Sequence, residues 1–233
     1  MLKVQNLTGG YDRSQILFDM NFEVGAGEVI CLMGRNGMGK TTTVKTMMGL
    51  LPAWKGAVEF EGRKLNGLSA ARVARGGFGL VPEGRQVFPN LTVDENLRVA
   101  AANRRGEENP WTTGKIYDLF PGLHERAGSW ANLLSGGEQQ MLAIGRALMT
   151  NPKLLILDEA TEGLAPVIRD QIWACIGRLR GLGQSIIVID KHIRRLLDVA
   201  DRFYVVEKGR TVWEGTPERV RAEEDKVKAF LSV

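Results

Sequence analysis

The chain has 233 residues, of which 44% are hydrophobic and 25% are charged, and this length and composition allow one globular domain with a sizeable core. Its 31 basic and 27 acidic residues give a net charge of +4; because they are dispersed, they form no basic stripe for nucleic acid. No apolar run approaches the roughly 18 residues that span a bilayer, and we see no export signal, so we expect a cytoplasmic protein.

Strand patterns come first in the chain. Apolar and polar residues alternate over 2–4 and again over 20–24, which is typical of half-buried strands. A compact apolar run over 28–33 leads into a glycine-rich loop, and residues 41–51 then carry apolar side chains at helical spacing. The pattern predicts a strand, a glycine loop and a helix in that order.

Two further strands are predicted at 57–61 and 78–81, after which the segment 84–150 changes character. Proline and glycine residues break this segment into short helices. Thr92 and Ser135 each precede a glutamate by three residues, which is the spacing of a capping box at a helix start. A helical insert is therefore expected within an α/β core.

The last third of the chain returns to strands. Short apolar runs at 153–157 and 185–189 are typical of fully buried parallel strands. Residues 204–214 form a predicted hairpin around Lys-Gly-Arg. A charged amphipathic helix is predicted over 217–230.

Residues 34–41, Gly-Arg-Asn-Gly-Met-Gly-Lys-Thr, fill every fixed position of a P-loop. The glycines let backbone N–H groups point at phosphate oxygens, Lys40 would neutralise the β- and γ-phosphates, and the Thr41 hydroxyl would bind Mg²⁺. The alternative, a glycine turn that only links strand to helix, does not explain Lys40 and Thr41. The predicted ATP-binding residues here are Gly34, Arg35, Asn36, Gly37, Met38, Gly39, Lys40, Thr41 and Thr42.

A second phosphate-site motif ends the strand predicted at 153–157. Asp158 would bind Mg²⁺ directly or through water, and Glu159 would act as the general base that polarises the attacking water. Two ordinary strand-end acids are the alternative, which the P-loop upstream makes a poor explanation.

The string Leu-Ser-Gly-Gly-Glu-Gln-Gln at 134–140 combines a cap with two glycines that leave helix N–H groups uncovered. Taken locally it is an anion site, or else a capping box without a ligand. With this string the chain resembles the ABC ATPase family over essentially its whole length. The resemblance implies that Ser135, Gly136, Gly137 and Glu138 bind the γ-phosphate of ATP held on a partner's P-loop, so that hydrolysis needs a dimer.

The family's fold is an α/β P-loop NTPase core with an N-terminal antiparallel β subdomain and an inserted α-helical subdomain. By this resemblance, residues 1–233 form a single ABC ATPase domain. Residues 1–82 and 151–233 would make the nucleotide-binding core. Residues 83–150 would make the helical insert, which ends in the 134–140 helix.

Of three more positions, one matches the family's pattern and two depart from it. Tyr11 would stack on adenine, with an exposed turn aromatic as the alternative. Glu83 stands where the family usually has glutamine near Mg²⁺, and a carboxylate can still bind the metal. The family's switch histidine corresponds to Lys191, and His192 comes one place later; both are candidates to contact the γ-phosphate, and we favour Lys191.

The strings at 81–85, 134–146 and 162–166 resemble the LivF-type ATPase of branched-chain amino acid importers. In that branch Glu83 and a residue other than histidine at 191 are typical. The resemblance implies a motor on the inner face of the cell membrane, paired with a LivG-like ATPase or with itself. Its further partners would be two membrane permease subunits and, indirectly, an external solute-binding protein.

Other functions compete with this one. A urea importer or another amino acid or amide importer would use the same motifs. A soluble ABC ATPase of DNA repair or translation usually carries two cassettes or a long coiled coil, whereas this chain has one cassette and a short insert. A small-molecule P-loop kinase has no use for the 134–140 string.

Overall fold

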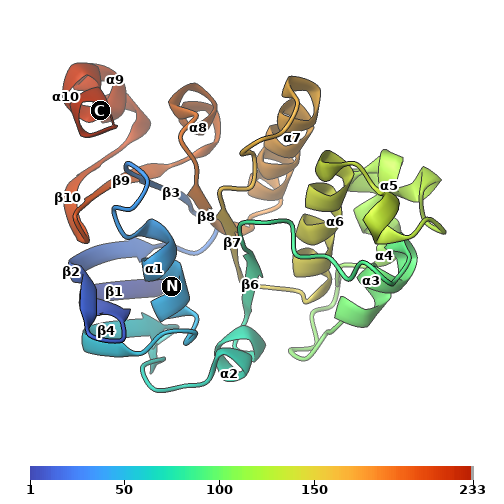
Figure 1. The fold of residues 1–233 in the computed structure, drawn as a ribbon, viewed down its shortest axis with the longest axis horizontal. Helices are drawn as coiled ribbons and strands as arrows, with labels where there is room; N and C mark the ends of the chain where they lie inside the picture. The colour runs from blue at the N-terminus through green and yellow to red at the C-terminus, as the bar shows by residue number, and fades with distance from the viewer. Residues whose placement is uncertain (232–233) are drawn as a thin grey trace.

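The computed structural model describes residues 1–231. In this part of the chain, ten strands join one sheet in the order β5-β4-β1-β2-β10-β9-β3-β8-β7-β6. Figure 1 shows the antiparallel strands on one side of the molecule and the helices α3–α6 on the other, with the parallel strands between them. The sheet therefore has two parts of different character.

The parallel part holds β3 (Val29–Met33), β8 (Ser185–Ile189), β7 (Leu154–Asp158) and β6 (Phe78–Val81). Every residue of the first three is buried, as expected of parallel strands covered on both faces. Successive side chains enter two different hydrophobic clusters on opposite faces of the sheet. This burial confirms the strands predicted from the short apolar runs.

The antiparallel part is built around β1 (Leu2–Tyr11), which pairs with β2 (Ser14–Val24) and β4 (Ala53–Phe60). A two-residue strand β5 (Arg63–Lys64) closes the edge. The predicted hairpin forms as β9 (Arg202–Glu207) and β10 (Arg210–Gly215), and it joins both parts because β9 pairs with β3 and β10 with β2. Residues 202–215, late in the chain, thus lie in the middle of the sheet.

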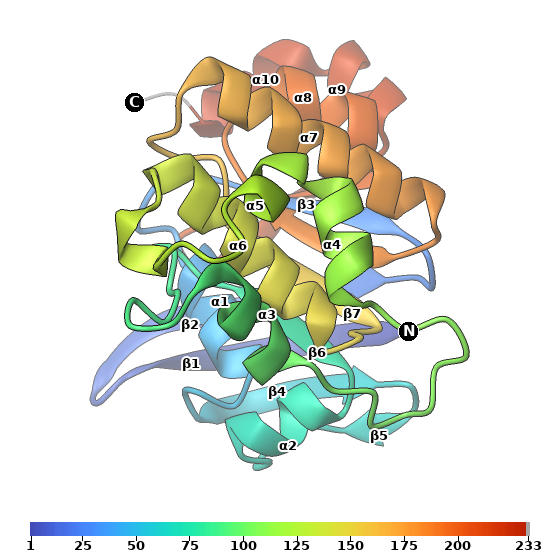
Figure 2. The ribbon, with the colours of Figure 1, turned by 90° about the vertical axis from the view of Figure 1, so that its right-hand side faces the viewer.

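The insert leaves after β6 and returns at β7. Its helices are α3 (Val93–Ala100), α4 (Thr113–Leu119), α5 (Pro121–Glu125) and α6 (Gly136–Met149), with a 3₁₀ turn at Ala131–Leu133. Figure 2 shows α3, α4 and α5 arranged around α6. Both predicted capping boxes are present, at Thr92 with Glu95 and at Ser135 with Glu138. The caps start α3 and α6 at the predicted residues.

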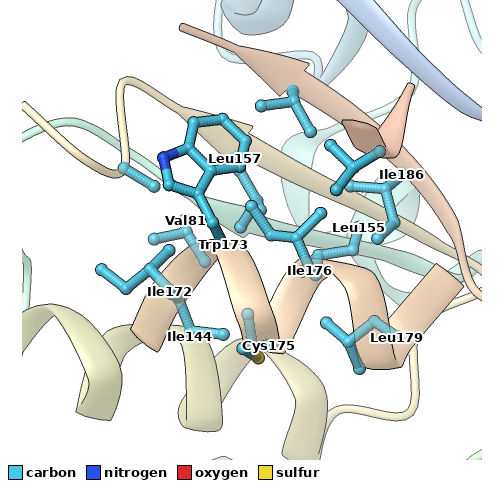
Figure 3. Packing of buried hydrophobic residues seen from close by; sticks show 14 of the residues in the cluster. Val81, Ile144, Leu155, Leu157, Ile172, Trp173, Cys175, Ile176, Leu179 and Ile186 are labelled. Carbon is cyan, nitrogen blue, oxygen red and sulfur yellow. The ribbon is translucent and has the colours of Figure 1, made fainter. Parts of the chain in front are cut away.

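Helix α7 (Pro166–Gly181) connects the insert to the sheet. Its apolar face, with Ile172, Trp173, Cys175, Ile176 and Leu179, packs against Leu155, Leu157 and Ile186 of the sheet and near Ile144 of α6 (Figure 3). Cys31 and Cys175 are both buried and free, which confirms the prediction of two reduced thiols. One continuous core therefore supports both the sheet and the helix that begins at the 134–140 string.

The predicted C-terminal helix is wrong in one respect, since it is two helices, α9 (Pro217–Ala222) and α10 (Glu224–Leu231). Glu223 leaves the helical conformation at φ −109°, ψ 30°. Its carboxylate accepts hydrogen bonds from Trp213 Nε1, Arg219 Nε and Lys226 Nζ. These contacts hold the break in place, and a local periodicity contains no sign of them.

Helices α2 (Ala70–Arg75), α7 and α8 (Ile193–Val199) were not predicted, whereas α1 (Lys40–Met47) confirms the helix expected after the glycine loop. None of the helices within residues 1–231 combines the length and the apolar character that crossing a membrane requires.

Candidate active site

The 34–41 loop lies between the buried end of β3 and the first turn of α1. Gly34 has φ 152°, and a Cβ there would lie 2.3 Å from the Val206 carbonyl oxygen, so the close approach of β9 requires glycine. Gly39 has φ 105° and precedes α1 without a side-chain cap. The first N–H groups of the helix are consequently free to face an anion.

Met38 connects the 34–41 loop to the turn between β9 and β10. Its backbone oxygen accepts a hydrogen bond from Gly209 N at 2.9 Å, and its sulfur accepts one from Lys208 N at 3.3 Å. Lys208 and Gly209 form the turn between β9 and β10. The side chain of Met38 therefore packs against the turn between β9 and β10.

Lys40 is 6% exposed and folds back over the loop. Its Nζ donates to the carbonyl oxygens of Gly34 at 2.8 Å and Arg35 at 3.0 Å, and lies 4.0 Å from Glu159 Oε1. Burial lowers the pKa of Lys40, and the nearby acids oppose that shift. The ammonium is thus already placed at the mouth of the loop.

Thr41 of α1 lies beside Asp158, the last residue of β7. The Thr41 hydroxyl donates to Asp158 Oδ1 at 3.4 Å. Burial raises the pKa of Asp158, and the negative charge of Glu83 adds to that rise while the Thr41 hydrogen bond opposes it. A hydroxyl and two carboxylates are oxygen donors of the kind that Mg²⁺ prefers, so the residues fit this ion.

Glu159 follows Asp158 in a left-handed conformation with φ 53°, and its N–H donates to the Ile189 oxygen at 2.9 Å. A hydrogen bond shared with the Glu162 carboxyl is the main reason that its pKa rises to about 7, with burial next. Glu162 itself has a lowered pKa because it accepts hydrogen bonds from Glu159 and Lys191. The proton of the pair thus belongs to Glu159.

Lys191 and His192 have different surroundings. Lys191 Nζ is 2.6 Å from Glu162 Oε1, and its side chain is 66% exposed. His192 has both ring nitrogens engaged, Nδ1 with Asp190 Oδ1 at 2.6 Å and Nε2 with Arg169 Nη1 at 3.1 Å. The lysine head is the freer of the two to reach a ligand.

The structure brings six of the predicted site residues to one cleft. It is lined by Gly34, Asn36, Lys40, Glu159, Glu162, Asp190, Lys191 and His192. Sequence reasoning missed Glu162 and Asp190 as members of the site. Both follow the carboxyl ends of buried strands, and acids at that edge of the sheet were the available signal.

Tyr11 ends β1 beside α1 and is 39% exposed. Lys45 of α1 donates to its hydroxyl at 3.4 Å and lies 5.6 Å from the ring centroid. The ring therefore lies beside the helix that follows the loop, with part of its surface open.

The 134–140 string occupies a separate place at the start of α6. Ser135 Oγ accepts from Glu138 N at 3.3 Å, while Glu138 Oε2 accepts from Ser135 N at 2.7 Å. Gly136 and Gly137 are the first two residues of the helix. Of the described residues that line the cleft, none comes from this string, so one chain does not bring its loop and its α6 N-terminus to the same cleft.

Comparison with known proteins identifies the family. The family model described as ABC transporter matches residues 17–162. The high-affinity branched-chain amino acid transport ATP-binding protein BraG of Pseudomonas aeruginosa is 43% identical over 216 residues, 93% of each chain. The probable branched-chain amino acid transport ATP-binding protein LivF of Archaeoglobus fulgidus is 34% identical over 217 residues, 93% of this chain and 92% of that one. The lipopolysaccharide export system ATP-binding protein LptB of Haemophilus influenzae is 32% identical over 234 residues, 99% and 97% of the two chains.

Solved structures agree with the sequences. The ATP binding subunit of an ABC transporter superposes with a TM-score of 0.81 at 29% identity, over 97% of this chain and 93% of that chain. A dimeric ATP-binding cassette bound to ADP and Pi superposes with a TM-score of 0.81 at 25% identity, over 93% and 99%. These matches confirm the expected P-loop NTPase fold, and with the sequence matches they show that the chain belongs to the ABC transporter family, as one of its ATP-binding subunits that hydrolyse ATP.

Proposed function

We propose that the chain is the LivF-type ATPase of a branched-chain amino acid importer. The observation that supports this proposal most is the 43% identity to BraG over 93% of both chains, against 32% to LptB. The chain would work at the inner face of the membrane with a LivG-like ATPase, or a second copy of itself, on two permease subunits. Residues 1–82 and 151–233 would form the nucleotide-binding core and residues 83–150 the helical insert.

Several residues in and beside the cleft have a role in this proposal. Lys40 would exchange its two carbonyl partners for β- and γ-phosphate oxygens, and the loop's N–H groups would bind the same phosphates. Thr41 and Asp158, with Glu83 nearby, would hold Mg²⁺. When bound, this ion neutralises charge on the phosphate oxygens.

The proton of the attacking water would pass to Glu159. A carboxylate can accept this proton only when it is deprotonated, and the hydrogen bond with Glu162 controls the fraction of Glu159 that is deprotonated.

Lys191 is our choice for the switch contact to the γ-phosphate, because both nitrogens of His192 already have partners. Tyr11 would stack on adenine, and Ser135, Gly136, Gly137 and Glu138 would bind the γ-phosphate of the partner's ATP.

The nucleotide part of the proposal is tested by Lys40→Ala. This variant should lose ATP affinity and lower ATP hydrolysis about a hundredfold or more, since a buried cation at the phosphates disappears. Wild-type binding and hydrolysis in the variant would exclude this cleft as the nucleotide site. Lys55→Ala, which removes an exposed lysine of β4 that is absent from the cleft, is the control.

The transport part is tested on the complex. The chain should co-purify with two permeases and a second ATPase, and the complex in liposomes should hydrolyse ATP faster with its solute-binding protein and leucine, isoleucine or valine. Stimulation by urea, and by none of these amino acids, would identify the complex as a urea importer. Stimulation by nucleic acid or ribosomes without membrane association would replace the transport function altogether.

A further inference from the structure

Arg85 lies against the first turn of α6. Gly84 and Arg85 both have positive φ, 89° and 56°, and this turn just after β6 aims the arginine side chain. A Cβ on Gly136 would lie 2.0 Å from Arg85 Nη1 and 2.6 Å from Cζ. A Cβ on Gly163, in the loop after β7, would lie 3.9 Å from Nη2. The guanidinium therefore touches the 134–140 string and faces the 160–166 loop.

This location is electrostatically unusual. The N-terminus of a helix carries a partial positive charge that stabilises anions and disfavours cations. Cα–Cβ bonds tilt toward the helix N-terminus, so a group in the space of a Gly136 Cβ lies on that positive side. Within residues 1–231, Arg85 forms no ion pair or hydrogen bond. Glu138, the acid of this turn, is bound to Ser135 N and lies 3.7 Å from Arg126. The positive charge here is thus not balanced.

The residues that follow Arg85 are bound to α6 and α3. Arg146 of α6 donates to the Gln86 oxygen at 2.5 Å and lies 4.1 Å from the Phe88 ring centroid. Buried Asn96 of α3 accepts from Phe88 N at 2.9 Å and donates to the Phe88 oxygen at 3.0 Å. These contacts tie residues 86–88, which follow Arg85, to α6 and α3.

We propose that Arg85 binds the γ-phosphate of the ATP held on the partner's P-loop, beside the N-terminus of α6; this rests on the proposed function. A guanidinium can donate two parallel hydrogen bonds to phosphate oxygens. The γ-phosphate brings the negative charge that the arginine and the helix end both lack. ADP has no such group, so Arg85 would make closure of the dimer depend on ATP.

The glycine at 136 follows from the same contact. Any larger residue there would displace the guanidinium, because the Cβ would overlap it. Arg85 and Gly136 should therefore behave as a coupled pair in a double-mutant cycle.

The test compares Arg85→Ala, Arg85→Lys and a control, Arg104→Ala, which removes an exposed arginine elsewhere in the insert. Steady-state ATP hydrolysis is measured in the assembly in which the wild-type chain is active, and binding of a fluorescent ADP analogue is measured on the isolated chain. Arg85→Ala should lower kcat/KM for ATP about tenfold or more, with ADP binding and the unfolding midpoint as in Arg104→Ala. Arg85→Lys should lower kcat/KM less, since lysine keeps the positive charge but cannot donate two parallel hydrogen bonds.

A second comparison separates phosphate binding from packing. Gly136→Ala should lower kcat/KM in the wild-type background and have a clearly smaller effect in the Arg85→Ala background. Hydrolysis by Arg85→Ala within twofold of the control, or a parallel loss of ADP binding and stability, would overturn the proposal. A wild-type chain that binds no ATP would instead be a failure of the proposed function itself.

Discussion

At the scale of single residues, Glu159 and Glu162 share a hydrogen bond between their carboxyl groups, and Lys191 holds the second of them at 2.6 Å. Glu162 thereby keeps its charge and leaves the proton on Glu159, whose pKa rises to about 7. Glu159, which we propose as the general base, is therefore protonated more often at neutral pH than an ordinary carboxylate.

This arrangement predicts a pH profile. Because the base acts when deprotonated, kcat/KM should rise with pH through about 7 and fall to about a tenth of its plateau one pH unit lower. In Glu162→Ala the hydrogen bond and the repulsion that raise the pKa of Glu159 are both removed. The acidic limb should then move to lower pH. Steady-state kinetics measured from about pH 5.5 to about pH 9 give both profiles.

Glu107→Ala serves as the control for that profile, since Glu107 pairs with Arg105 in the insert and is absent from the cleft. Its acidic limb should coincide with the wild-type one. If the acidic limb of Glu162→Ala also coincides with the wild-type limb, Glu162 does not control the protonation of Glu159.

Glu159→Gln provides a second prediction. The amide cannot accept the proton of water, so turnover should fall about 10²–10⁴-fold, while ATP binding stays because Lys40 and the loop are unchanged. Rapid-quench hydrolysis and equilibrium binding of ATP measure the two effects. Full turnover would remove Glu159 from the role of base.

At this scale the sequence predicts most of the cleft but few of its contacts. Lys40, Thr41, Asp158 and Glu159 stand at fixed spacing within two motifs, so they could be found one by one. Glu162 and Asp190 could not, since their roles depend on pairing across the sheet edge. The choice between Lys191 and His192 likewise depends on Asp190 and Arg169, which local sequence does not place in contact.

At the scale of elements, α7 connects the insert to the sheet through Trp173, which is 5% exposed (Figure 3). Trp173→Ala would leave a large cavity between α7 and the sheet and should lower the free energy of unfolding by about 3–5 kcal/mol. Urea unfolding measures this loss.

Val167 lies in the same helix and is 69% exposed, so Val167→Ala should change the free energy of unfolding by about 0.5 kcal/mol or less. Equal effects of the two substitutions would mean that α7 is not part of the core that positions α6.

Buried strands and capped helices could be predicted because their signals are local. The runs that became β7 and β8 and the boxes at Thr92 and Ser135 are examples. The break at Glu223 could not, because Trp213 reaches it from β10. Helix α7 carries local signals that the predicted elements leave out: Pro166 stands at its start, and Ile172, Ile176 and Leu179 recur at helical spacing.

At the scale of the whole molecule, the cleft and the 134–140 string lie in different parts of one chain, so the site that we propose would need two chains to be complete. If the chain hydrolyses ATP as a homodimer, Lys40→Ala and Ser135→Arg should each be inactive alone. An equimolar mixture should recover about a quarter of wild-type activity, since half the dimers are mixed and each has one intact site.

Single variants mixed with themselves are the controls for this experiment, measured by the same ATPase assay. A mixture as inactive as its components would mean that both motifs act within one chain. Recovery only after addition of a second ATPase would indicate a heterodimer.

The turn at Lys208 and Gly209 has a consequence for dissecting the protein. Gly209 donates to the Met38 oxygen and accepts from Phe18 N and Asp19 N, and a Cβ on it would lie 1.8 Å from the Ile16 oxygen. The turn between β9 and β10, in the last third of the chain, therefore supports the 34–41 loop near the beginning of the chain. A fragment limited to residues 17–162, the stretch matched by the family model, would keep residues 34–41, 134–140 and 158–159 but lose the turn between β9 and β10. We therefore expect the smallest unit able to bind nucleotide to extend through β10.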